Sequence, residues 1–257
     1  MKNGTFLSGW VFLLRNPMRL IAALLVGCLI PLATAWAEKP PDYVTAINRA
    51  LGEARPEPAT APKAWLLAFV DVETTGLVPG YHEMVDIGVV LTDLSGAEVG
   101  SFFVRMMPDH PERASDITER INSFTEERWR SLDAVDEARA VEDLVAFHRK
   151  HAGDRAVLMV AYNSWFDIAF LDYLFRQQGR TWRELYHYFI LDLPSMAWGQ
   201  GLRHLAGKPL AESLGLTPET SVAEDHTGLS GARFNVAVYR ALMSRLATAD
   251  GEGEGDK

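Results

Sequence analysis

Runs of apolar residues alternate with polar stretches from residue 64 onwards, and their lengths predict strands and helices in a definite order. The expected strands are the apolar run before Asp71, then Glu83–Thr92, Ala97–Met107, Ala156–Ala161 and Phe189–Asp192. The expected helices are Ala138–His151, Trp165–Gln178 and Phe234–Leu246. Three strands joined by short turns indicate an antiparallel meander, and the later helix–strand alternation indicates a mixed α/β sheet flanked by helices.

The first strand ends in two carboxylates. Leu66–Val70 leads directly into Asp71 and Glu73, and a run this apolar is typical of a strand buried on both faces. Alternate side chains of a strand share a face, so the two carboxylates point the same way, about 7 Å apart. Such a pair favours a bound cation with hard oxygen ligands, Mg²⁺ or Mn²⁺. Taken alone, the same two residues also fit a strand end that meets solvent.

The N-terminal segment has the pattern of a targeting sequence over residues 1–37. Two arginines precede a long apolar run, and Ala35-Trp-Ala37 is a small-x-small cleavage site. Two other interpretations stay open: a lipoprotein box at Leu25–Cys28, or a retained membrane anchor over Leu20–Ala37 that tethers the protein. All three predict export, either to a bacterial periplasm or to the outer side of a membrane.

The remaining boundaries follow from composition. Residues 38–63 are predicted to be a proline-rich connector, with one amphipathic helical segment over Asp42–Ala54. Residues 64–247 form the expected folded domain, and residues 248–257 an acidic, disordered tail. The only cysteine, Cys28, precedes the domain, so disulfide and thiol chemistry are excluded there.

The charge of the chain limits its partners. The formal net charge is −9, which argues against a long basic footprint on a nucleic-acid duplex. A site that grips a short strand end through metal ions remains compatible with this charge.

Two further clusters contain candidate chemistry. The strand Ala156–Ala161 is followed by Asn163, Trp165, Phe166 and Asp167. Helix capping explains Asn163, the helix dipole favours a carboxylate at Asp167, and core packing is the expected role of both aromatic residues. His226 opens the last helix, and near a metal ion it could take a proton from water.

Together these clusters resemble the DnaQ-like 3′–5′ exonucleases of the DEDD type, histidine subclass, which have a ribonuclease H-like fold. The segment Asp71–Gly76 matches the first family motif, and Asn163–Asp167 matches the second. Weaker family features follow in the expected order at Val85–Val89, Leu191–Asp192 and Leu210–Leu216. The resemblance covers about residues 65–246.

The resemblance implies a role for each matching residue. Asp71, Glu73 and Asp167 would bind Mg²⁺ or Mn²⁺ in a two-metal site, and His226 would deprotonate the attacking water. The positions implied for substrate binding are Thr74, Thr75, Gly76, Asn163 and Phe166. The partners implied are the 3′ ends of single-stranded DNA or RNA, or short oligonucleotides.

The third motif departs from the family pattern His-x-Ala-x-x-Asp. His226 is retained, but Gly228 and Gly231 stand at the last two positions, so one metal-ligating carboxylate is missing. Water or Asp225 could fill the vacancy, and the glycine alone would fit a tight helix–strand contact. The hypothesis is therefore a metal-dependent exonuclease whose activity is reduced by the lost ligand. The alternative is a catalytically inactive module of the same fold that binds nucleic acid or a protein. The sequence predicts no oligomeric state.

Overall fold

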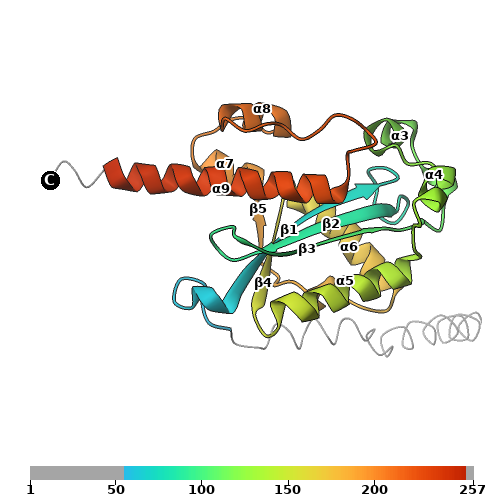
Figure 1. The fold of residues 1–257 in the computed structure, drawn as a ribbon, viewed down its shortest axis with the longest axis horizontal. Helices are drawn as coiled ribbons and strands as arrows, with labels where there is room; N and C mark the ends of the chain where they lie inside the picture. Colours follow the sequence, from blue (N-terminus) through green and yellow to red (C-terminus); the bar gives the residue numbers. More distant parts are fainter. Residues whose placement is uncertain (1–54, 253–257) are drawn as a thin grey trace, which may run out of the picture. The chain divides into compact units, whose positions relative to one another are not determined.

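The computed structural model describes residues 55–252, and these contain one five-stranded mixed sheet with helices on both faces (Figure 1). The strands lie in the order β3-β2-β1-β4-β5. Their bounds are β1 Trp65–Thr74, β2 Met84–Thr92, β3 Glu98–Arg105, β4 Ala156–Ala161 and β5 Ile190–Asp192. The antiparallel meander β1–β2–β3 and the parallel additions β4 and β5 confirm the predicted mixed sheet.

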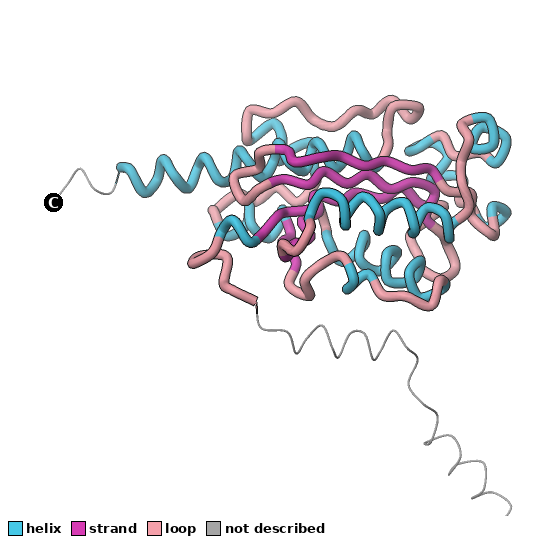
Figure 2. The backbone as a smooth tube through the Cα atoms, turned by 60° about the horizontal axis from the view of Figure 1, so that its bottom comes forward, coloured by secondary structure: helices cyan, strands magenta, loops and turns pink. Residues whose placement is uncertain are grey.

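Helices cover the two faces of the sheet separately (Figures 1 and 2). One face packs on α5 and α6, and the other on α7 and α9. Their bounds are α5 Glu137–Ala152, α6 Ser164–Gln177, α7 Leu193–Gly199, α8 Gly207–Ser213 and α9 Gly228–Glu252. β1 is the central strand and contributes to both cores, as its continuous apolar run requires.

Two short helices that the sequence pattern did not indicate occur in the polar stretch after β3. They are α3 Asp116–Asn122 and α4 Glu126–Ser131, and both lie near the carboxyl end of β1 (Figure 1). The indole Nε1 of Trp129 donates a buried hydrogen bond of 2.8 Å to the carbonyl of Val85, which attaches α4 to β2. Short turns also occur as 3₁₀ helices at Pro62–Ala64, Pro111–Arg113 and Trp182–Glu184.

Several of the predicted segments lie at the two ends of the chain. The targeting segment, the lipoprotein box, the membrane anchor and the helical segment over 42–54 all lie outside the described residues. Helix α9 continues to Glu252 and so enters the tail that the sequence predicts to be disordered. Across residues 55–252, every helix is too short or too polar to span a membrane.

Candidate active site

The carboxyl end of β1 opens into a cleft of about 450 Å³ that gathers most of the predicted site residues. Asp71 and Glu73 line it from β1, Asp167 from the first turns of α6, and His226 from the loop before α9. Thr74, Gly76 and Phe166 also line it. The period of a strand and the start of a helix thus place three carboxylates and one imidazole around a single cavity.

Thr75, Asn163 and Trp165 each lie in an environment that differs from the predicted one. Thr75 is fully buried, and its hydroxyl accepts a hydrogen bond of 2.9 Å from the Glu83 amide, so it supports the chain turn and does not line the cleft. Asn163 takes a left-handed conformation at the start of α6, and its side chain makes no capping hydrogen bond. Asp192 accepts the nearby Ser164 amide instead, at 3.0 Å. The predicted capping role of Asn163 was wrong.

The predicted core position of Trp165 was also wrong. Its side chain is 61% exposed beside the cleft, whereas the sequence pattern favoured core packing. Phe166 packs partly against the core and partly lines the cleft, and Phe170 of the same helix is buried. Consecutive aromatic residues on a helix point in different directions, and the apolar character of Trp165 alone could not show which direction meets solvent.

The carboxylates of the cleft repel one another. Burial raises the pKa of Asp71 well above its usual range, and the charges of Asp167 and Glu73 raise it further. Burial, followed by the charge of Asp86, raises the pKa of Glu73 to about 9. Burial also raises the pKa of Asp167, although backbone amides oppose that shift. This electrostatic strain is the environment that a divalent cation relieves.

The sequence pattern did not indicate the residue that holds Glu73 in place. The buried Asn122 side chain donates hydrogen bonds to Glu73 Oε2 at 3.1 Å and to the Thr74 carbonyl at 3.2 Å. Its own oxygen accepts the amide of Phe124 at 3.0 Å. Asn122 is the last residue of the short helix α3, in the polar stretch after β3, and no local signal identified it.

Asp86 on β2 attaches the start of α9 to the sheet. It is completely buried, and its Oδ1 accepts a hydrogen bond of 2.8 Å from the Gly228 amide. Burial raises the pKa of Asp86 to about 7, and the hydrogen bond from Gly228 opposes the rise. The weaker family feature at Val85–Val89 contains this residue, so a sequence signal was present although its role was not recognised.

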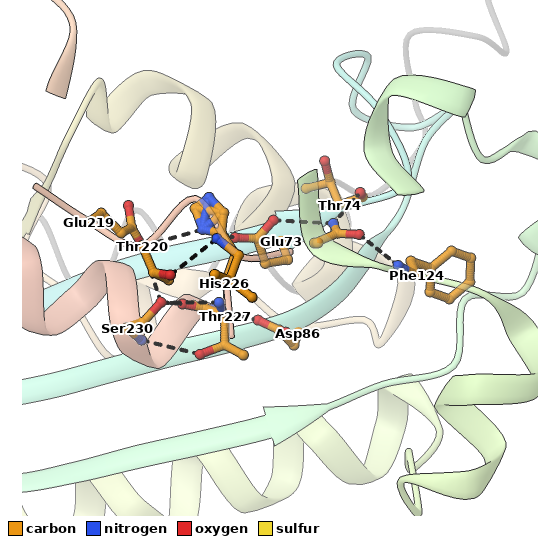
Figure 3. A network of polar contacts seen from close by, with 12 residues as sticks. Glu73, Thr74, Asp86, Phe124, Glu219, Thr220, His226, Thr227 and Ser230 are labelled. Atoms are coloured by element: carbon orange, nitrogen blue, oxygen red, sulfur yellow. Dashed lines mark hydrogen bonds and ion pairs between the residues drawn. The ribbon is translucent and has the colours of Figure 1, made fainter. Parts of the chain in front are cut away.

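His226 lies between two carboxylates (Figure 3). Its Nδ1 is 3.7 Å from Glu73 Oε1 and 3.4 Å from Glu219 Oε1. Glu219 comes from the loop between α8 and α9 and was not identified from sequence. Burial raises the pKa of Glu219, while His226 and the Ser230 hydroxyl oppose the shift. Both carboxylates therefore approach the same ring atom, Nδ1, from different parts of the chain.

Gly231 contacts Asp71 directly. A Cβ atom built at Gly231 would lie 2.3 Å from Asp71 Oδ2, so the Asp71 carboxylate occupies the space that a side chain would need. This is the tight helix–strand contact expected of Gly231, and Gly228 makes a second one against backbone, where a Cβ would lie 2.5 Å from the Asp71 carbonyl oxygen and from the Gly88 nitrogen. Among the described residues, no three His, Cys, Asp or Glu side chains already have the arrangement of a metal site.

Comparison with known proteins supports the family resemblance. Residues 68–239 match the RNase_T family, described as exonuclease. The chain is 25% identical over 179 residues to the 3′-5′ DNA exonuclease Cap18 of Escherichia coli, covering 69% of this chain and 91% of that protein.

Solved structures share the fold. Exonuclease I of Escherichia coli, in complex with a dT13 oligonucleotide, matches 73% of this chain with a TM-score of 0.60 and 14% identity. The match spans only 43% of the exonuclease I chain. The nuclease domain of 3′hExo, a DEDDh family member bound to rAMP, matches 70% of this chain and 92% of its own, with a TM-score of 0.58 and 14% identity.

Proposed function

This chain belongs to the RNase_T exonuclease family, the DnaQ-like 3′–5′ exonucleases with a ribonuclease H-like fold, and we propose that it hydrolyses single-stranded nucleic acids from their 3′ ends with a divalent cation. The observation that carries the proposal is the gathering of Asp71, Glu73, Asp167 and His226 around one cleft. Short oligonucleotides suit this acidic chain best as substrates, because they need no long basic groove.

The residues of the cleft fit Mg²⁺ or Mn²⁺. Their donors are carboxylate oxygens, the ligands that both ions prefer, and burial together with mutual repulsion favours a cation among them. Asp71 and Glu73 would hold the ion near the attacking water, and Asp167 would support a second. Such ions lower the pKa of a water molecule and stabilise the charge on the scissile phosphate and leaving oxygen.

The chain's own side chains perform the remaining steps. His226 accepts the proton of the attacking water, and the carboxylates of Glu73 and Glu219 beside its Nδ1 stabilise the imidazolium that results. Asn122 holds Glu73 in place through its hydrogen bond of 3.1 Å.

The walls of the cleft favour an unpaired strand. Ile117 and Ile121 of α3 line it together with Phe166, and Leu77, which is 75% exposed, lines it from the turn after β1. Apolar and aromatic side chains hold unstacked bases with little sequence preference, and the exposed Trp165 offers a further stacking surface nearby. A duplex, whose bases are stacked and paired, could not make these contacts.

The N-terminal pattern extends the proposal to location. A targeting segment over residues 1–37 would place the nuclease outside the cytoplasm, either released or tethered to a membrane.

The direction in which the enzyme shortens an oligonucleotide tests the proposed function. We expect full-length protein with Mn²⁺ to shorten a 5′-labelled single-stranded oligonucleotide stepwise, and to release a 3′ label at once as mononucleotide. Phosphorothioate linkages at the 3′ end should slow the reaction, whereas the same linkages at the 5′ end should not affect the first steps. EDTA should stop hydrolysis because the carboxylates then lack the cation. Gel electrophoresis of DNA and RNA substrates measures each of these.

A binding module without catalysis is the second candidate, and Gly231 favours it, because the residue removes a carboxylate that the family uses. It predicts that the protein leaves DNA and RNA intact with either ion, while fluorescence anisotropy still detects binding of a labelled oligonucleotide. That pair of results would refute the nuclease proposal.

A further inference from the structure

Glu219 approaches the active site from a loop that lies between α8 and α9. Its Oε1 accepts a hydrogen bond of 3.1 Å from the Ser230 hydroxyl and lies 3.4 Å from His226 Nδ1 (Figure 3). Ser230 is itself fixed at the start of α9, where its amide donates to Thr227 Oγ1 at 3.2 Å and its hydroxyl accepts from the Thr227 amide at 3.1 Å. The loop carboxylate therefore has a defined position on α9.

That position is next to the residue that lacks a carboxylate. Ser230, which holds Glu219, directly precedes Gly231, and Gly231 faces the Asp71 carboxylate. The negative charge of Glu219 acts on both Asp71 and Glu73, so its carboxylate lies within electrostatic range of the two predicted ligands on β1. A glutamate side chain has one more methylene than an aspartate, which extends its reach from the loop.

The charges around Asp71 also favour a cation beside it. The neighbouring charges that raise the pKa of Asp71 are all negative, and they come from Asp167, Glu73, Glu219 and Asp86. Within residues 55–252, no arginine or lysine forms an ion pair with any of these five carboxylates. A buried set of like charges without a paired base is stabilised by a metal ion.

We propose that Glu219 supplies the carboxylate that Gly231 lacks, and that it binds the divalent cation together with Asp71 and Glu73. This inference rests on the proposed nuclease function and names a ligand for its metal site. Asp225, the substitute considered from sequence, is exposed on the same loop and forms no side-chain hydrogen bond or ion pair with any described residue of the cleft. Glu219 has the contacts that Asp225 lacks.

Mn²⁺ binding tests the assignment without any measurement of catalysis. Full-length protein is titrated with Mn²⁺, and the free ion is measured by electron paramagnetic resonance. We expect Glu219→Gln to raise the Kd at least about tenfold, because loss of even an indirect partner of a metal site costs about 10–100-fold. Asp225→Asn makes the same change of charge and shape on the same loop, and it should leave the Kd within twofold of the wild-type value.

A second variant keeps the charge and removes only the support. Ser230→Ala deletes the hydroxyl that donates to Glu219, so we expect a smaller, several-fold rise in the Kd. Circular dichroism confirms that each variant is folded, and this variant gives a result even if Glu219→Gln fails to fold.

The outcomes separate this inference from the function on which it rests. If the wild-type protein fails to bind Mn²⁺, the metal-dependent nuclease and the Glu219 assignment are both overturned. If wild type binds and Asp71→Asn does not, while Glu219→Gln and Ser230→Ala bind as well as wild type, only the Glu219 assignment is overturned. An unchanged Kd with a shifted pH–rate profile in Glu219→Gln would show that Glu219 acts through His226 and not on the metal.

Discussion

Asp71→Asn should lower the rate of hydrolysis by at least about 100-fold, because it removes a carboxylate that we assign as a direct metal ligand. Loss of even an indirect partner of a metal site commonly lowers affinity or activity by about 10–100-fold. Asparagine has the same shape, so the packing of β1 in the sheet is retained. Asp71 lies at the centre of the site, where Asp167, Glu73 and Glu219 all act on it. Single-turnover cleavage of a labelled oligonucleotide and the Mn²⁺ titration both measure the loss.

The same variant should not destabilise the metal-free protein. The pKa of Asp71 is raised in the folded state above its usual 3.8, so its favourable contribution to folding is complete below about pH 3.8 and is lost as the pH rises toward the folded pKa. At neutral pH in EDTA the Asp71 carboxyl group therefore costs stability, and asparagine removes that cost. We expect the Tm of Asp71→Asn in EDTA to equal or exceed that of wild type.

Asp225→Asn is the matched control for both measurements, since it neutralises an exposed aspartate that lies outside the cleft. A variant at Asp71 that hydrolyses oligonucleotides at the wild-type rate would remove Asp71 from the mechanism. A variant that merely unfolds would lose Tm and activity together, which is distinguishable from the expected result.

Gly228→Ala should cause a large loss of stability. Its Cβ would meet backbone atoms, the Asp71 carbonyl oxygen and the Gly88 nitrogen, both at 2.5 Å, and neither can rotate away. Overpacking of a core costs up to about 3 kcal/mol, and this contact between backbones lies at that upper end. For a domain of this size, about 3 kcal/mol corresponds to a Tm lower by roughly 10 °C. Differential scanning calorimetry measures the shift.

Gly231→Ala is the matched comparison, because both glycines lie in the first turn of α9. Here the atom that Cβ would meet is Asp71 Oδ2, at the end of a side chain that can turn aside. Alanine also favours a helix interior by about 1 kcal/mol over glycine. We therefore expect Gly231→Ala to keep or raise the Tm and to weaken Mn²⁺ binding about tenfold, in line with a displaced metal partner. Equal losses of Tm in the two variants would contradict this explanation.

The sequence determined the central features of the site through local rules. The apolar run of β1 shows a strand, and the period of two in a strand puts Asp71 and Glu73 on one face. Asp167 follows strand β4 at the start of a helix, a position that brings it to the same edge of the sheet. These inferences succeed because each depends on residues within a few positions of one another.

Other features were decided only by tertiary structure. Asn122 is 49 residues from Glu73 along the chain, at the end of the short helix α3, and only the folded chain brings the two side chains together. Trp165 faces solvent and Thr75 is buried, and in both cases the neighbours that decide this are distant in sequence.

The third motif shows most clearly which features the sequence determined and which the tertiary structure determined. The sequence established that His226 is retained and that Gly231 carries no carboxylate. Only the folded chain brings Glu219 against His226 and Ser230, and only there does the Asp71 carboxylate fill the space beside Gly231. The physical reason is that a loop residue has no periodicity to reveal its direction, so its position depends on the surface onto which the loop folds.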